Sequence, residues 1–251
     1  MTDLLRADGL RKRFGELVAI DGVDLALPER RLTAIIGPNG AGKTTLINLL
    51  TGALAPDAGR VYFRGEEITG LPTHARVRRG LSRSFQVINV FAHLSVRQNM
   101  LVPVLARHGR AHRAFSGCER ETEALAEADA LLREVGLWEA REQPAGLLSH
   151  GDQRLLELGI AVAPRPALCF LDEPASGLTP LERGTVLDLV RKLSVERQTT
   201  FAVIEHDMDV VFALADWIVV LHRGRVLAEG LPAAIRENRE VREIYLGEEL
   251  A

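Results

Sequence analysis

The sequence is poor in the features that mark several classes of protein. Only two of its 251 residues are cysteine, Cys118 and Cys169, and they form neither a CxxC pair nor a metal-ligand pattern. This excludes a disulfide-rich scaffold and favours a reducing compartment such as the cytoplasm. The N-terminal residues lack the apolar core of a signal peptide, and no apolar run approaches the ~18 residues needed to span a bilayer. We therefore expect a soluble chain, which could still dock on a membrane protein.

The sequence also lacks a strong excess of charge of either sign. Its 31 basic and 34 acidic residues give a formal net charge of −3, which provides no overall attraction to nucleic acid or anionic lipid. Lysine is scarce, since it occurs only at Lys12, Lys43 and Lys192 and the other basic residues are arginine. The hydrophobic content of 47% suffices for the core of one α/β domain, with or without a smaller inserted lobe.

A glycine-rich segment follows the β-like run RLTAII and precedes the helical run LINLLTG. It reads GPNGAGKTT and has the GxxxxGK[ST] spacing of a phosphate-binding loop. Glycines let backbone N–H groups face a phosphate, and the following helix adds the positive end of its dipole. Lys43 supplies a cation for the β- and γ-phosphates, and Thr44 a hydroxyl for Mg²⁺. The predicted nucleotide-binding residues are Gly37, Pro38, Asn39, Gly40, Ala41, Gly42, Lys43, Thr44 and Thr45.

Two adjacent carboxylates follow a second apolar run, in ALCFLDEP. Asp172 and Glu173 stand where this predicted strand ends, and ligands of open α/β sheets bind at such ends. We predict that Asp172 holds Mg²⁺, directly or through water, and that Glu173 orients or deprotonates the water that attacks the γ-phosphate. No NKxD element for reading guanine is present, which favours ATP.

The stretch LLSHGDQR opens a further helical run and allows two interpretations. Ser149 is a good helix N-cap, because its hydroxyl can accept a hydrogen bond from a free backbone N–H of the first turn. The same helix N-terminus could instead hold a phosphate.

Taken in order, these motifs resemble the nucleotide-binding subunit of an ABC transporter. The resemblance rests on the phosphate loop, Gln86 after LSRSF, LSHGDQR upstream of FLDEP, and IEHD at residues 204–207, and it spans residues 4–246. It implies that two ATPase subunits pack head to tail, so that Ser149 and the N–H of Gly151 touch the γ-phosphate of ATP held by the other subunit. His150 and Asp152 depart from the family signature LSGGQ, whereas Gly151 is kept.

Further roles follow from the resemblance alone. Phe14 resembles the aromatic residue that stacks on adenine, with a core phenylalanine as the alternative. Gln86 resembles the residue that senses Mg²⁺ and water, and His206 the switch histidine at the γ-phosphate; these two join Glu173 as the catalytic residues. Thr179 stands where the family has an aspartate.

The implied architecture is an α/β fold with a P-loop NTPase (RecA-like) core, an antiparallel β subdomain and an inserted helical lobe. Residues 1–86 and 165–251 are expected to form the ATP-binding core, and residues 87–164 the helical signature lobe. Within the lobe, residues 108–120 are predicted to form a surface loop.

The insertion after Gln86 and the tail EGLPAAIRENREVREIYLGEE resemble one subgroup of importers. That subgroup energises uptake of branched-chain and related amino acids, with close relatives that handle urea and short amides. The implied partners are two transmembrane permease subunits, which dock near residues 87–99, a second ATPase subunit (a paralogue or a copy of the same chain) and, indirectly, a periplasmic binding protein. The implied location is the cytoplasmic face of the bacterial inner membrane. A soluble ABC ATPase of an assembly scaffold stays open as an alternative, whereas no nucleic-acid partner is expected.

Overall fold

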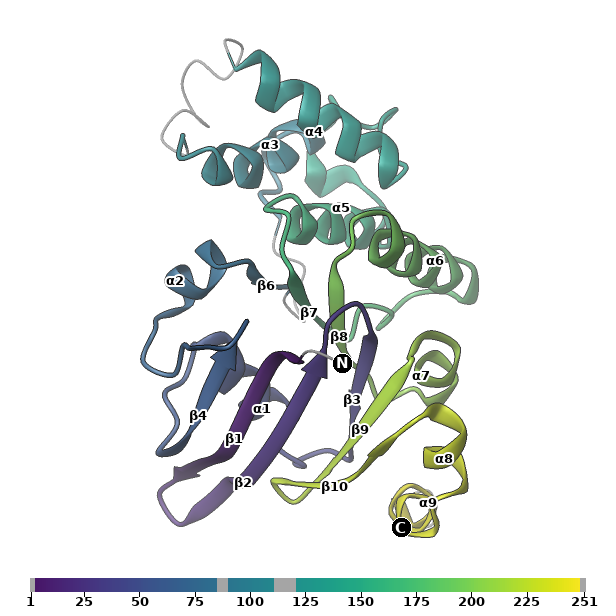
Figure 1. The fold of residues 1–251 in the computed structure, drawn as a ribbon. Helices are drawn as coiled ribbons and strands as arrows, with labels where there is room; N and C mark the ends of the chain where they lie inside the picture. Colours follow the sequence, from purple (N-terminus) through teal and green to yellow (C-terminus); the bar gives the residue numbers. More distant parts are fainter. Residues whose placement is uncertain (1–2, 85–89, 111–120, 249–251) are drawn as a thin grey trace.

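The computed structural model describes residues 3–84, 90–110 and 121–248, which form two β-sheets and the helices that cover them (Figure 1). The strands are β1 Asp3–Phe14, β2 Leu17–Pro28, β3 Leu32–Ile36, β4 Ala58–Phe63, β5 Glu66–Glu67, β6 Leu81–Arg83, β7 Leu168–Asp172, β8 Thr200–Ile204, β9 Trp217–His222 and β10 Arg225–Gly230. The helices are α1 Lys43–Thr51, α2 Thr73–Arg78, α3 Val96–Arg107, α4 Thr122–Glu134, the 3₁₀-helix η3 Ala145–Leu147, α5 His150–Val162, α6 Pro180–Glu196, α7 Met208–Leu214, α8 Pro232–Glu237 and α9 Arg239–Glu248.

The larger sheet places the phosphate loop, Asp172, Glu173 and His206 along one edge. Its strand order is β10-β9-β3-β8-β7-β6, with parallel pairing from β6 to β9 and β10 antiparallel to β9. All five residues of β3, β7 and β8 are buried, as expected for central strands of a parallel sheet covered on both faces. Because the carboxyl ends of parallel strands share one edge, the segments that follow β3, β7 and β8 lie close together.

The smaller sheet is antiparallel, in the order β2-β1-β4-β5, and matches the expected antiparallel β subdomain. Its strand β1 covers a segment for which the sequence predicts no strand. Register shifts between Ala7 and Leu10 and between Lys12 and Arg13 break the alternation of apolar and polar residues that would have revealed it. Apolar side chains of this sheet and of α1 share one core with the larger sheet.

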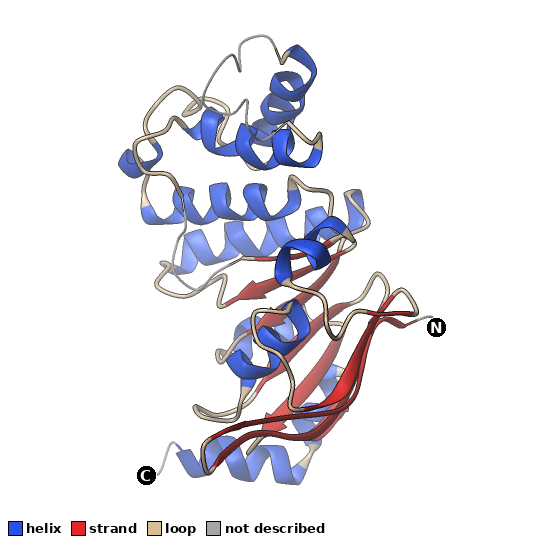
Figure 2. Ribbon diagram, turned by 90° about the vertical axis from the view of Figure 1, so that its left-hand side faces the viewer, coloured by secondary structure: helices blue, strands red, loops and turns tan. Residues whose placement is uncertain are grey.

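The helices of residues 90–164 stack above the other face of the larger sheet (Figures 1 and 2). Helices α3 and α4 form the outer pair, and α5 lies between them and the sheet. One continuous apolar cluster runs from Phe201 on β8 through Leu156 on α5 to Met100 on α3 and Leu131 on α4. The predicted boundary after residue 164 falls in the turn between α5 and β7, whereas the boundary after residue 86 lies outside the described residues.

A buried arginine ties α2 to the end of α1. The guanidinium of Arg76 donates hydrogen bonds to the carbonyls of Leu49 and Leu50 in the last turn of α1 and to those of Thr69 and Leu71. Carbonyls at a helix end or in a turn need such donors, and Arg76 itself is only 1% exposed. Burial lowers the pKa of Arg76 to about 10.

The chain ends in two short helices beside β9 and β10. Helix α8 contacts β9, β10 and α9, and Ile235 and Val241 anchor the pair in the core. Within the described residues, no helix is both long and apolar enough to cross a membrane.

Candidate functional site

The predicted phosphate loop joins β3 to α1 and depends on glycine at two positions. Gly42 is the N-cap of α1 with φ 102°, and a Cβ there would lie 2.6 Å from the carbonyl oxygen of Ala19. A Cβ on Gly37 would lie 2.1 Å from the carbonyl oxygen of Leu221. Gly40 instead faces open space, because a Cβ there would meet no atom within 4 Å. No side chain caps the N-terminus of α1, so its first N–H groups face the loop, as an anion-binding helix end requires.

The ammonium group of Lys43 lies over this loop. Nζ donates hydrogen bonds to the carbonyls of Gly37 and, at 3.0 Å, Pro38. Thr44, the next residue, is exposed at the start of α1, and Thr45 is half-buried. The loop therefore presents a cation and a hydroxyl beside a run of backbone N–H groups.

Asp172 and Glu173 meet this loop from the end of β7. Asp172 is only 5% exposed, and its Oδ2 lies 2.9 Å from a guanidinium nitrogen of Arg83. Glu173 adopts the left-handed conformation with φ 47°, which is uncommon for a residue other than glycine. Its N–H donates to the carbonyl of Ile204 at 2.9 Å, which fixes the end of β7 to the end of β8. Strain of this kind is often stored at functional sites.

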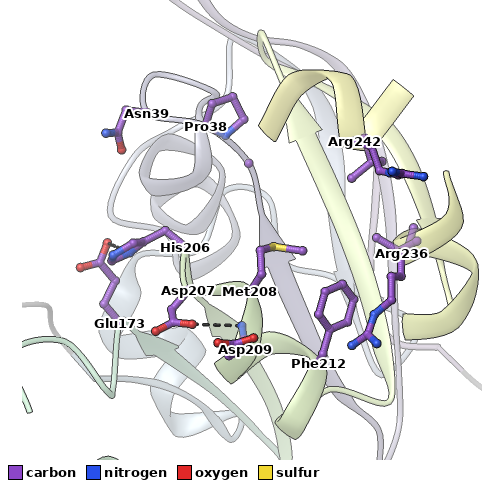
Figure 3. Close-up of a pocket in the computed structure, with 13 residues that line it drawn as sticks. Pro38, Asn39, Glu173, His206, Asp207, Met208, Asp209, Phe212, Arg236 and Arg242 are labelled. Carbon is purple, nitrogen blue, oxygen red and sulfur yellow. Dashed lines mark hydrogen bonds and ion pairs between the residues drawn. The ribbon is translucent and has the colours of Figure 1, made fainter. Parts of the chain in front are cut away.

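His206 follows β8 and points toward Glu173 (Figure 3). Its Nδ1 lies 3.4 Å from Glu173 Oε1, and the imidazole is 60% exposed while the carboxylate is 21% exposed. Two of the three predicted catalytic side chains are therefore close together, beside the phosphate loop.

A buried carboxyl lies directly behind this pair. Glu205 is 2% exposed, and its Oε1 accepts a hydrogen bond from the N–H of Ala175 at 3.3 Å. Burial raises the pKa of Glu205, and the nearby Glu173 acts in the same direction, whereas the hydrogen bond from Ala175 and the charge of His206 oppose the shift. No sequence motif identifies Glu205, since only the fold shows that it is buried against the segment after Glu173.

A cavity of about 810 Å³ brings three parts of the chain together (Figure 3). Its walls come from the phosphate loop, from the segment around Glu173 and His206, and from the C-terminal helices α8 and α9. The lining residues are Gly37, Pro38, Asn39, Glu173, His206, Asp207, Met208, Asp209, Phe212, Ile235, Arg236, Val241 and Arg242. Arg236 stacks on Phe212, with its guanidinium carbon 4.3 Å from the ring centroid, so α8 contacts the helix that begins just after His206.

The predicted signature lies apart from this cavity. Ser149 is the N-cap of α5, and its Oγ accepts a hydrogen bond from the N–H of Asp152 at 3.1 Å. Gly151 faces Glu182, because a Cβ on Gly151 would lie 2.7 Å from Glu182 Oε1. Ser149 and Gly151 are both described and neither lines the cavity. The capping interpretation of Ser149 therefore holds within the chain.

Three other predicted positions have different outcomes. Phe14 ends β1 and is 47% exposed, so it is not a core phenylalanine; the Lys12 ammonium lies 5.8 Å from its ring centroid. Gln86 lies outside the described residues. Thr179, in place of the family's aspartate, is the N-cap of α6, and a capping box joins its hydroxyl and N–H to Glu182.

The donor set fits a magnesium ion that is bound together with a nucleotide. Thr44 and Asp172 supply hydroxyl and carboxylate oxygens, the ligands that Mg²⁺ prefers. Among the described residues no group of three or more His, Cys, Asp or Glu could hold a metal alone.

Comparison with known proteins identifies the family. Residues 20–176 match the family described as ABC transporter, and residues 225–251 match the family described as Branched-chain amino acid ATP-binding cassette transporter. The high-affinity branched-chain amino acid transport ATP-binding protein BraF of Pseudomonas aeruginosa is 42% identical, and LivG of Escherichia coli K12 is 39% identical; in each comparison 98% of both chains is covered. The probable LivG of Methanocaldococcus jannaschii is 33% identical over the same shares.

Solved structures give the same result. MJ1267, an ATP-binding cassette of an ABC transporter in its ADP conformation, superimposes with a TM-score of 0.88 and 32% identity, covering 98% of this chain and 100% of that chain. A nucleotide-free ATP-binding cassette gives a TM-score of 0.86 with 31% identity, covering 97% and 99%. Sequence, fold and site geometry therefore agree: the chain belongs to the ATP-binding, ATP-hydrolysing subunits of ABC transporters, in the group that carries the branched-chain amino acid cassette segment at its C-terminus.

Proposed function

We propose that this subunit powers the import of branched-chain amino acids. The observation that carries the proposal is the match of residues 225–251 to the C-terminal segment of branched-chain amino acid cassettes, joined to 42% identity with BraF over 98% of both chains. In the fold this segment includes β10, α8 and α9, and residues of α8 and α9 form one wall of the cavity beside Glu173 and His206. The same segment argues against a soluble ATPase of an assembly scaffold.

The proposed substrate of hydrolysis is ATP with Mg²⁺. The backbone N–H groups of Gly40 and Gly42 and the ammonium of Lys43 bind the phosphates, and Phe14 stacks on the adenine. Thr44, Asp172 and Gln86 hold the metal, directly or through water. When bound, Mg²⁺ neutralises part of the charge that develops on the phosphate oxygens.

The chemical step falls to Glu173 and His206. Glu173 accepts a proton from the water that attacks the γ-phosphate. His206, whose Nδ1 lies 3.4 Å from Glu173 Oε1, orients the Glu173 carboxylate and contacts the phosphate. Ser149 and Gly151 complete the site of a second ATPase subunit, either a paralogue or another copy of this chain. The separation of the signature from the chain's own cavity supports this head-to-tail arrangement.

The proposed assembly comprises two permease subunits, which contact residues 87–99, and a periplasmic binding protein on the far side of the membrane. The subunit then lies on the cytoplasmic face of the bacterial inner membrane. Residues 87–89 of the proposed contact lie outside the described residues.

Reconstitution tests the proposal and its nearest alternative. The chain is co-expressed with the proposed permease subunits, and phosphate release is measured in proteoliposomes with the binding protein. Leucine, isoleucine or valine is expected to stimulate hydrolysis several-fold. Stimulation by urea or a short amide instead would assign the subunit to the importers of urea and short amides. Failure to co-purify with membrane subunits would contradict a transport role.

A further inference from the structure

Arg83 connects three elements behind the proposed metal site. It is the last residue of β6, the edge strand that pairs with β7 and leads toward Gln86. One guanidinium nitrogen, Nη2, lies 2.9 Å from Asp172 Oδ2, and the other, Nη1, donates to Asn48 Oδ1 on α1 at 2.5 Å. The sequence alone suggests nothing about this residue, because its partners are 35 and 89 positions away.

Both partners matter to the position of metal-binding oxygens. Asn48 lies four residues after Thr44 on α1, so the two share one face of the helix. Asp172 ends β7 on the other side of Arg83. The guanidinium therefore sets the spacing between the helix that carries Thr44 and the strand that carries Asp172.

The charge pair is shielded from water. The side chains of Arg83 and Asp172 are 13% and 7% exposed, and a pair so buried is sensitive to the loss of either partner. A planar guanidinium holds two acceptors in fixed directions, which a lysine ammonium cannot reproduce. The contact occupies Oδ2, and a carboxylate has a second oxygen for a metal ion or for water bound to it.

We propose that Arg83 is the positioning residue for the divalent cation, holding the Asp172 carboxylate at a fixed distance from Thr44. The inference rests on the proposed function, in which Asp172 and Thr44 contact Mg²⁺. Residues that orient a metal ligand typically change metal affinity by about 10–100-fold when they are replaced. Arg83 acts through Asp172 and does not touch the nucleotide, so its removal weakens the response to metal and leaves metal-free nucleotide binding in place.

The test measures how much Mg²⁺ tightens the binding of a fluorescent ATP analogue, by titrations of the full chain in EDTA and in rising MgCl₂. For Arg83→Gln we expect an unchanged dissociation constant in EDTA, and a Mg²⁺ concentration for half-maximal tightening raised by about 10–100-fold. Arg83→Lys should recover only part of the loss. Asn48→Ala keeps the charge pair but removes the hydrogen bond between Arg83 and α1. It should shift the Mg²⁺ midpoint in the same direction by a smaller factor, and it tests the inference if Arg83→Gln does not fold.

A matched control separates positioning from general stability. Arg197→Gln removes a comparable pair, in which Nε lies 2.8 Å from Glu134 Oε1, far from the nucleotide, and should leave the Mg²⁺ midpoint unchanged. If Mg²⁺ tightens binding by wild type, and both Arg83→Gln and Asn48→Ala have the same Mg²⁺ midpoint as wild type, this inference is wrong and the proposed function stands. If Mg²⁺ does not tighten binding by wild type at all, the metal role of Asp172 fails and the inference fails with it.

Discussion

The side chain of Lys43 shows how single residues prepare the phosphate site. Its ammonium group donates to two carbonyls of the loop that surrounds it, so the charge is already placed where the phosphates are expected to lie. At Gly37 and Gly42 any larger residue would place its Cβ against the carbonyl oxygen of Leu221 or Ala19, respectively. The loop geometry is thus set by steric limits and the charge by one lysine.

Replacing Lys43 with alanine should remove nucleotide binding at ordinary working concentrations. Two charge-assisted hydrogen bonds of about 1.5–3 kcal/mol each correspond to a loss of roughly 10²–10⁴-fold in affinity. Titration with a fluorescent ATP analogue measures it, with Lys192→Ala on the exposed face of α6 as the control. Near-normal affinity of Lys43→Ala would rule out the assigned phosphate loop.

The buried Glu205 carboxyl should make stability depend on pH. Because its folded pKa is raised above the unfolded value, the native state favours the protonated form, and its contribution to stability declines as pH rises through the folded pKa. Glu205→Gln keeps an acceptor for the Ala175 N–H without a charge. Its melting temperature should exceed that of wild type at pH 8, and the difference should shrink toward pH 5. An advantage that is equal at both pH values would contradict the assigned shift.

At the scale of elements, one buried side chain joins two helices beside the larger sheet. Helix α2 is only six residues long, yet Arg76 fastens it to the last turn of α1 through carbonyls of both segments. The phosphate loop leads into the start of α1, and Arg76 holds the opposite end of this helix.

Arg76→Met should therefore destabilise the whole chain. The methionine fills part of the space but removes the guanidinium donors to the carbonyls of Leu50, Thr69 and Leu71, while the carbonyl of Leu49 keeps the N–H of Gly52; the expected cost is on the order of 3 kcal/mol. Urea unfolding followed by circular dichroism measures the loss, and Arg78→Met, an exposed arginine of the same helix, is the control. Equal midpoints for the two variants would show that the carbonyls find other partners.

Contiguous motifs were predictable from the sequence, and contacts between distant segments were not. The phosphate loop, the Asp172–Glu173 pair and the N-cap at Ser149 depend on neighbours within a few residues, so their spacing identifies them. Arg83, Glu205 and Glu182 gain their surroundings from strand order and from the packing of α5 on α6, which no local pattern encodes. Strand β1 was not predicted, because register shifts interrupt its alternation of apolar and polar residues.

At the scale of the whole molecule, the predicted site residues lie on two separate parts of the chain. Three residues of the phosphate loop, Glu173 and His206 line the cavity beside the C-terminal helices, whereas Ser149 caps α5 and does not line it. We propose that one chain binds the nucleotide beside its phosphate loop and that a second subunit completes the site.

Ser149→Arg should spare nucleotide binding by the isolated chain and stop hydrolysis by the assembled transporter. The arginine side chain would block the surface that we propose meets the other subunit, and position 149 does not line the chain's own cavity. Binding titrations of the chain and phosphate release by the reconstituted complex are compared. Equal loss of both would place Ser149 within the chain's own site.

Glu173→Gln tests the central claim most directly, because it preserves shape and removes only the charge and the ability to accept a proton. General-base catalysis is typically worth about 10²–10⁴-fold, so phosphate release by the reconstituted transporter should fall by that factor while ATP still binds. With repulsion at the γ-phosphate reduced, ATP but not ADP should drive the variant into a two-subunit complex that size-exclusion mass measurement detects. Hydrolysis within a few-fold of wild type would contradict the account and place the base elsewhere.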